Sequence, residues 1–232
     1  AEDCIARNVD AMVLDPIESS ALSGVIEEAG KRGIPITVLD TPIDSPYVVS
    51  QIGVPQYDVS KELGQFVAGY IIGRMDGKAK IGLMLASTEV QLLRRDGFAE
   101  ALKAVPGAEI VATGDGRNQL ERSIAEAEDM LLGNPDINVI YATGDPALQG
   151  ALAAAASQGR ENIAFFGWDD IPAPFIEPLK DGRIVGFIKQ GPDHGGKMGV
   201  RLALEAAAGK DVPPRYRVPV NVVTTYNVND FL

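Results

Sequence analysis

Short apolar runs alternate with longer amphipathic segments along most of the chain, a pattern typical of parallel βαβ units. The apolar runs are bounded by Gly, Pro, Asn or Asp, and this punctuation indicates strands. We expect strands at residues 11–14, 36–39, 47–52, 81–85, 109–112, 139–141, 163–166, 184–188, 216–220 and 222–226. The pattern therefore predicts an α/β protein built on parallel sheets.

The amphipathic segments carry apolar residues at helical spacing. Residues 22–29 follow the i, i+3, i+4, i+7 pattern, with Ser19 as the expected N-cap and Gly33 at the end of the helix. Further helices are expected at 59–71, around 98–102, and at 120–131, 146–157, 173–179 and 193–208. Residues 1–7 also fit a helix, so the chain opens as if inside a βαβ unit whose first strand is absent.

Composition and charge narrow the class of protein. A chain of 232 residues with 46% hydrophobic residues is large enough for one large domain or two small ones. Its 32 Asp and Glu residues outnumber 21 Lys and Arg residues and give a formal net charge of -11, which opposes binding to phosphate backbones. We therefore expect no nucleic-acid partner.

Residues for metal or covalent chemistry are scarce. Cys4 is the single cysteine and His194 the single histidine, so neither an internal disulfide nor a Cys/His zinc set is available. The sequence contains no G-x-S-x-G elbow, no P-loop and no complete dinucleotide fingerprint. We expect no metal and no cofactor, and we keep an enzyme only as the third class of function.

Polar or charged residues follow almost every predicted strand. In open parallel sheets, ligands bind beyond the carboxyl ends of the strands. The residues at these positions lie at 15, 40, 87–88, 94–95, 115–118, 143–145, 168–170 and 190. Carboxylates together with Arg, Asn and Gln side chains recognise hydroxyls and other small polar groups through charge-assisted hydrogen bonds.

Each of these positions also has a purely structural interpretation. Asp, Ser and Asn after a strand are common helix caps and turn formers, and Asp145 is expected to cap a helix that begins at Pro146. Trp168 should pack in the core if Asp169 faces a ligand, because neighbouring strand residues point to opposite faces. Two adjacent helical arginines, at 94 and 95, diverge by about 100°, so only one can face a site squarely.

Six segments recur in a defined order and spacing across the whole chain, at residues 9–16, 33–40, 94–98, 144–151, 166–169 and 188–192. In these segments the chain resembles the type I periplasmic sugar-binding proteins of the ribose-binding class. The resemblance implies two Rossmann-like lobes with parallel sheets, joined by three hinge crossovers near residues 51–53, 190–191 and 221. The amino-terminal lobe would comprise residues 1–52 with 191–221, and the carboxy-terminal lobe residues 53–190 with 222–232.

The resemblance also implies a ligand site in the cleft between the lobes. Positions that match the family's ligand contacts are Asp40, Arg94, Asn118, Asp169 and Gln190. Gly144 stands where the family usually has Asn, which removes one amide. The family's first strand, helix and strand are not found, so the amino-terminal lobe is expected to be incomplete. We expect such a chain to bind weakly or to self-associate through the edge at residues 11–14.

The function implied by the resemblance is reversible binding without chemistry. The protein would be the periplasmic solute-binding component of an ABC-type uptake system, with a sugar or similar polyol as ligand and a membrane permease as partner. The alternative is a periplasmic sensor that reports ligand state to a membrane kinase or chemoreceptor, whose ligand need not be a sugar.

Overall fold

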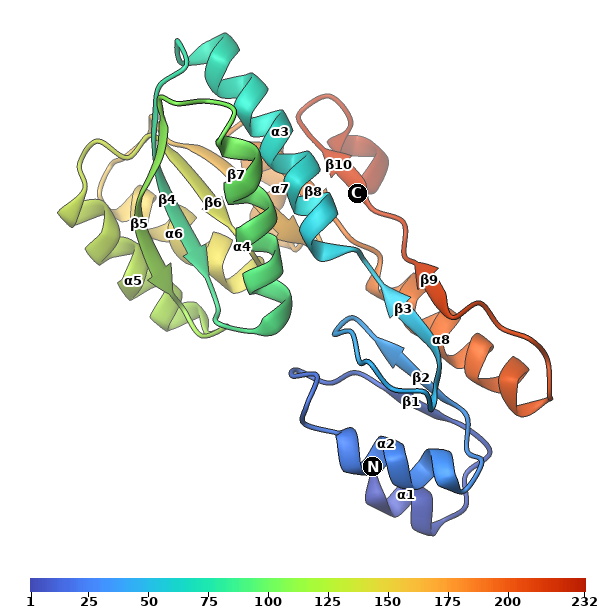
Figure 1. Ribbon diagram of the computed structural model, residues 1–232. Helices are drawn as coiled ribbons and strands as arrows, with labels where there is room; N and C mark the ends of the chain where they lie inside the picture. Colours follow the sequence, from blue (N-terminus) through green and yellow to red (C-terminus); the bar gives the residue numbers. More distant parts are fainter. The chain divides into compact units, whose positions relative to one another are not determined.

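The computed structural model describes residues 1–232, which divide into two compact units (Figure 1). The first unit comprises residues 1–55, 88–90 and 191–219, and the second comprises residues 56–87, 91–190 and 220–232. Each unit contains a mainly parallel sheet with helices packed on it. The predicted α/β class is confirmed.

The first unit is built on a four-stranded parallel sheet of order β1-β2-β3-β9. Its strands are β1 (Met12–Leu14), β2 (Ile36–Leu39), β3 (Val48–Gly53) and β9 (Arg215–Arg217). Its helices are α1 (Glu2–Ala6), α2 (Ser23–Lys31) and α8 (Pro192–Ala207). Strands β1 and β9 form the two edges of this sheet.

Alternation along β1 and β2 explains how helices cover both faces of this sheet. Met12 and Leu14 belong to one apolar cluster with Ile26 of α2. The intervening Val13 faces Gly199 of α8 instead. This two-residue period is the one expected when successive strand side chains point to opposite faces.

The second unit is built on a six-stranded sheet of order β10-β8-β7-β6-β4-β5. Its strands are β4 (Ala79–Leu85), β5 (Ala108–Asp115), β6 (Val139–Ala142), β7 (Ala164–Asp169), β8 (Ile184–Lys189) and β10 (Asn221–Val223). Its helices are α3 (Gln56–Arg74), α4 (Glu89–Leu102), α5 (Leu120–Gly133), α6 (Asp145–Ser157), α7 (Ala173–Lys180) and the 3₁₀ helix η1 (Val228–Phe231). All pairs are parallel except β10, which runs antiparallel to β8. No helix of either unit combines the length and the apolar character that crossing a membrane requires.

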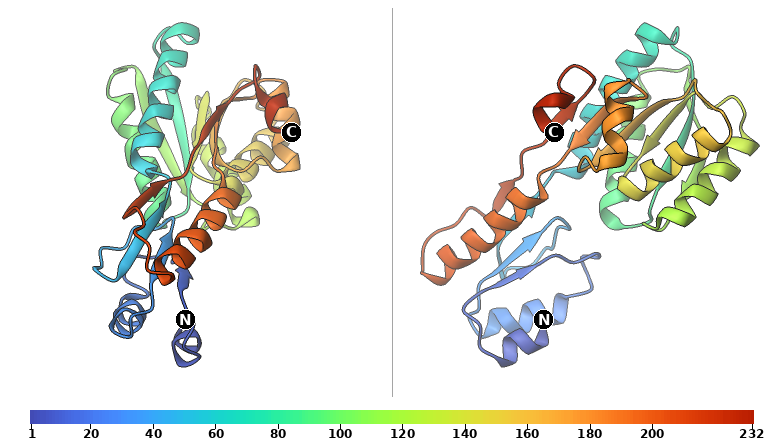
Figure 2. Two further views of the ribbon diagram at one scale, coloured as in Figure 1. Left: turned by 90° about the vertical axis from the view of Figure 1, so that its right-hand side faces the viewer. Right: turned by 180° about the vertical axis from the view of Figure 1, so that it is seen from behind.

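Helices cover both faces of the six-stranded sheet. Phe98 of α4 stacks on Tyr141 of β6, with ring centroids 4.0 Å apart. On the other face, Leu131 of α5 and Leu148 of α6 share an apolar cluster with Phe187 of β8. Figure 1 and the right-hand view of Figure 2 show this unit from opposite sides, with α3 and α4 on one face of the sheet and α5 and α6 on the other. The central strands are buried on both faces, which is why they appear in the sequence as nearly continuous apolar runs.

Several predicted boundaries differ from the structure for local reasons. Ser19 is not the N-cap of the first long helix, because residues 18–22 form successive turns and α2 begins only at Ser23, after Leu22. Asp145 is not a cap either: Gly144 is the N-cap of α6 and Asp145 is its first helical residue.

The boundaries between the units also differ by a few residues from those expected. Residues 53–55 stay with the first unit, because β3 continues to Gly53 and α3 starts only at Gln56. Asn221, expected in the amino-terminal lobe, instead begins β10 and pairs with Lys189 of the second unit.

Close packing of α3 on α4 generates a stability prediction. A Cβ atom at Gly97 would lie 2.1 Å from the carbonyl oxygen of Tyr57, so a side chain there would push the two helix backbones apart. We expect Gly97→Ala to lower the free energy of unfolding by about 1–3 kcal/mol, as overpacking does.

The matched control is Gly69→Ala on α3, where a Cβ atom meets nothing within 4 Å. Because alanine favours a helix interior, this variant should gain about 0.5–1 kcal/mol. Denaturant unfolding of both variants followed by circular dichroism measures the difference, and equal stabilities would contradict the packing argument.

Candidate functional site

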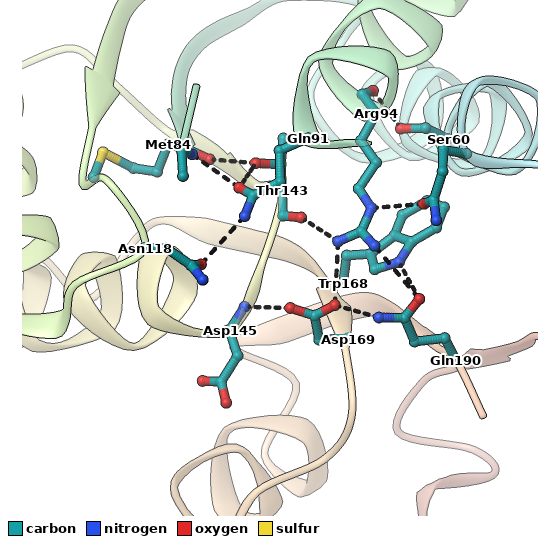
Figure 3. A network of polar contacts seen from close by, with 12 residues as sticks. Ser60, Met84, Gln91, Arg94, Asn118, Thr143, Asp145, Trp168, Asp169 and Gln190 are labelled. Atoms are coloured by element: carbon teal, nitrogen blue, oxygen red, sulfur yellow. Dashed lines mark hydrogen bonds and ion pairs between the residues drawn. The ribbon is translucent and has the colours of Figure 1, made fainter. Parts of the chain in front are cut away.

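A connected set of polar side chains lies at the carboxyl ends of the central strands of the second unit (Figure 3). Arg94, on α4, is its centre and is only 3% exposed. Its Nε donates to Oε1 of Gln56 at 2.8 Å, and its Nη1 donates to the carbonyl oxygen of Thr143 at 2.7 Å. Nη1 also contacts Oδ1 of Asp169 at 3.1 Å as an ion pair. The buried positive charge is thus paired and hydrogen-bonded, as such a charge must be.

Asp169 ends β7 and joins Arg94 to two other elements. Its Oδ1 accepts a hydrogen bond from Nε2 of Gln190 at 2.5 Å, at the end of β8. Its Oδ2 accepts from the backbone N–H of Asp145 at 2.8 Å, in the first turn of α6. One carboxylate therefore ties together the carboxyl ends of two neighbouring strands and the start of a helix.

Trp168 is buried as expected, but its role is not confined to the core. The Arg94 guanidinium lies over its ring at 4.5 Å from the centroid, and its Nε1 donates to Oε1 of Gln190 at 3.4 Å. Asp169 has a φ of 124°, outside the regular strand region. The simple rule that strand neighbours diverge therefore fails at this strand end, and both Trp168 and Asp169 contact Arg94.

Gln91 forms a second branch of the network, one helical turn before Arg94 on α4. Its Oε1 accepts from the backbone N–H of Ala86 at 2.8 Å and from the hydroxyl of Thr143 at 2.6 Å. Its Nε2 donates to Oδ1 of Asn118 at 3.3 Å. Asn118 and the preceding Arg117 both have positive φ, 59° and 49°, and this left-handed pair turns the chain after β5.

The helix that carries Arg94 is itself anchored to its neighbours. The hydroxyl of Ser60, on α3, donates to the carbonyl oxygen of Arg94 at 2.6 Å and lies 2.7 Å from the Tyr141 hydroxyl. Complete burial raises the pKa of Tyr141. The Ser60 hydroxyl has one hydrogen, which it donates to Arg94, so the Tyr141 hydroxyl donates to Ser60. The backbone from which the guanidinium extends is therefore fixed as well as the guanidinium itself.

Asp40 lies in the first unit, directly after β2. Its φ is 56°, and its backbone N–H donates to the carbonyl oxygen of Ile52 at 2.9 Å. Asp15 follows the adjacent strand β1, and burial, followed by the charge of Asp40, raises the pKa of Asp15. Two carboxylates thus lie at the carboxyl edge of the four-stranded sheet.

Four of the five predicted site residues converge in one unit: Arg94, Asn118, Asp169 and Gln190 belong to the second unit, while Asp40 belongs to the first. Arg95 is exposed and pairs with Asp96, so only the first of the two arginines enters the network, as its helical position required.

Three members of the network were not among the predicted site residues: Gln56, Gln91 and Thr143. Thr143 directly follows a predicted strand, and Gln91 lies three positions before Arg94 on the same helix face. Their positions in the sequence could therefore have indicated that they belong to the site. Gln56 lies at the very start of a helix and left no such indication.

The chemistry available in this site is hydrogen bonding and charge. No group of three or more His, Cys, Asp or Glu side chains is placed to hold a metal ion. The network offers carboxylate and amide oxygens as acceptors and amide and guanidinium groups as donors, held by bonds to backbone and to one another. Such fixed, mixed donors and acceptors suit a ligand rich in hydroxyl groups.

Comparison with known proteins agrees with this geometry. The family model described as periplasmic binding protein domain matches residues 1–211. The chain belongs to the periplasmic binding protein family. As a member of this family it is similar to the ABC transporter periplasmic-binding protein YphF of Escherichia coli K12, with 31% identity over 78% of this chain. It is also similar to the D-ribose/D-allose-binding protein of Pseudomonas aeruginosa, with 32% identity over 90% of this chain.

The chain spans 57% and 66% of the lengths of these two relatives. Among solved structures, it is similar to an ABC transporter periplasmic solute-binding protein from Actinobacillus succinogenes with bound D-allose. The TM-score is 0.88 at 26% identity, over 99% of this chain and 83% of that one. The periplasmic binding protein type I fold of the chain is thereby confirmed.

The environment of Asp145 generates a pH prediction. Burial raises the pKa of Asp145 above its ordinary value; a hydrogen bond from Gln149 opposes this rise, and the nearby charges of Asp169 and Asp170 add to it. The folded state then binds more protons than the unfolded state, so the free energy of unfolding falls as pH rises through this range. Asp145→Asn should therefore be more stable than the parent at pH 7, and the gain should shrink toward pH 4. Denaturant unfolding at both pH values tests this, and a gain that grows on acidification would contradict it.

Proposed function

We propose that this protein is the solute-binding component of an ABC-type uptake system and that it binds a sugar or similar polyol reversibly. The observation that carries the proposal is the preorganised set Arg94, Asp169 and Gln190. Relatives named for binding ribose and allose, and a solved relative with bound D-allose, support the ligand class.

The exposure of each side chain suggests which role it has in ligand binding. Arg94 is almost fully buried, whereas the side chain of Asp169 is 25% exposed. Asn118 is exposed and Gln190 is half-buried. We propose that Arg94 balances the charge of Asp169 and orients it, and that Asp169, Gln190 and Asn118 present hydrogen-bonding groups to ligand hydroxyls. Asp40, on the first unit, remains a predicted ligand contact.

Binding and release in the periplasm, with delivery to a membrane permease, complete the proposal. An affinity on the order of micromolar, about -8 kcal/mol, is sufficient for a reversible carrier. The similarity to YphF, which is named an ABC transporter periplasmic-binding protein, supports this assignment. Co-purification of the protein with a permease, rather than with a sensor kinase, tests the partner.

The exposed carboxylate edge of the network generates a binding prediction. Asp169→Asn keeps the shape of the side chain but removes the charge and replaces one acceptor oxygen by a donor. Affinity for the best-bound member of a panel of D-ribose, D-allose and myo-inositol should fall about tenfold to a hundredfold. Isothermal titration calorimetry measures the change.

The matched control is Asp170→Asn, one residue further along the chain. The Asp170 side chain is 61% exposed and pairs with Lys189 instead of Arg94. This variant should bind within about twofold of the parent. Equal losses in both variants, or no loss at position 169, would contradict the assignment of Asp169 to the site.

A further inference from the structure

We propose that two copies of this chain associate through the open edge of strand β1 and the neighbouring exposed flank of helix α8. Both elements belong to the first unit, whereas the network around Arg94 belongs to the second. The inference therefore goes beyond the proposed function and does not rest on it. The sequence predicts self-association at residues 11–14, and the structure adds a helix surface beside that edge.

Strand β1 has unpaired backbone groups on its outer side. It pairs with β2 alone and so forms an edge of the four-stranded sheet. The backbone N–H of Met12 donates toward β2, to the carbonyl oxygen of Pro35 at 2.9 Å. Because successive residues of a strand direct their backbone groups to opposite sides, the N–H and C=O groups of Val13 point outward. Such groups are a template for pairing with a further strand.

The two edges of this sheet differ in their side chains. Strand β9, at the other edge, carries Arg215 and Arg217, and both are exposed. Charged side chains on an edge strand oppose pairing with another chain. Strand β1 has no charged residue, and its Val13 is 37% exposed. The edge at β1 is therefore the one that favours a partner strand.

Exposed apolar side chains extend this edge onto α8. The helix packs on the sheet at Gly199. His194, on one flank of α8, stacks on Tyr216 of β9, so the other flank is turned toward the β1 side of the sheet. That flank carries Val200 and Leu204, which are 51% and 58% exposed. The edge strand and these two side chains form one apolar surface.

A two-fold axis at Val13 makes this surface complementary to itself. In a C2 contact the same patch meets itself, so the two β1 strands run antiparallel. The Val13 N–H of each copy then donates to the Val13 carbonyl oxygen of the other. An axis perpendicular to the sheet keeps helix α8 of both copies on the same face.

The position of α8 fits a second copy of the chain. A Cβ atom at Gly199 would lie 2.8 Å from Cδ2 of Leu39, on β2, and 3.2 Å from Cγ1 of Val13, so the helix lies over the gap between β1 and β2. With paired strands about 4.8 Å apart, the two α8 helices then lie about 10 Å apart. Packed helices lie about 8–10 Å apart, so Val200 and Leu204 of the two copies fill the space between them.

Two carboxylates give the contact a characteristic salt dependence. Asp10 precedes β1 and Asp15 follows it, and both are exposed. Antiparallel pairing places Asp10 of one copy near Asp15 of the other, so like charges approach each other at both ends of the contact. Salt screens this repulsion, and the dimer should therefore strengthen with added salt.

Sedimentation velocity of the whole chain, from about 1 μM to about 100 μM, measures the association. Leu204→Lys places a charge between the two helices, and its matched control is Leu132→Lys on α5, where the leucine is 71% exposed. Val13→Pro removes the outward N–H and leaves the bonds to β2, because proline is accepted on an edge strand whose N–H faces solvent. Hydrogen exchange of residues 11–15 and 215–217 locates the contact.

We expect a monomer–dimer equilibrium whose dissociation constant rises at least tenfold in Leu204→Lys and Val13→Pro and stays unchanged in Leu132→Lys. Amides at 11–15 should gain protection as the protein concentration rises, and those at 215–217 should not. If Val13→Pro melts well below the parent, Leu204→Lys decides, since its side chain lies on the exposed flank of a helix.

Four results would overturn the inference. They are a parent that stays monomeric at every concentration and salt level, equal dissociation constants for Leu204→Lys and Leu132→Lys, a dimer in which residues 11–15 gain no protection, and a monomer in which those residues are already protected because another segment covers the edge. Sugar or polyol binding by a monomer would leave the proposed function standing.

Discussion

A buried positive charge is the constraint on which the second unit's site depends. Removing a guanidinium from water is costly unless its N–H groups are hydrogen-bonded and its charge is paired. Arg94 finds its partners in several different elements. Gln56 comes from the start of α3, Thr143 from the end of β6 and Asp169 from the end of β7. Satisfying one side chain therefore fixes the relative positions of one helix start and two strand ends.

The parallel sheet makes this convergence possible. Strands β6, β7 and β8 are adjacent and point the same way, so their last residues meet at one edge. Helix α4, held to α3 by Ser60 and by the glycine at position 97, carries Arg94 to the same edge. The order of the strands and the packing of the helices therefore bring the site residues together. The rigidity of the site is what a binding protein needs, because groups already oriented lose less freedom on binding.

Much of this was predictable from the sequence. Apolar runs located the central strands, because strands buried on both faces form nearly continuous apolar segments. Polar residues after those runs gave a long list of candidates, from which the resemblance to the ribose-binding class selected Arg94, Asp169 and Gln190. Other features depend on contacts between distant residues. The positive φ of Asp169, the carboxamide of Gln56 beside Arg94 and the Gln91 branch follow from tertiary packing and leave little local trace. Ser19 shows the limit for helix ends, where a good capping residue precedes turns instead of the helix itself.

The central claim is that the planar, multiply bonded guanidinium of Arg94 orders the site for ligand binding. Titration calorimetry of Arg94→Lys against Arg95→Lys, with the best-bound sugar or polyol, tests it most directly. Lysine keeps the charge but cannot reproduce the fork of hydrogen bonds to Gln56, Thr143 and Asp169. The account predicts at least a tenfold loss of affinity for Arg94→Lys and none for the exposed neighbour. Equal affinity in the two variants would contradict it.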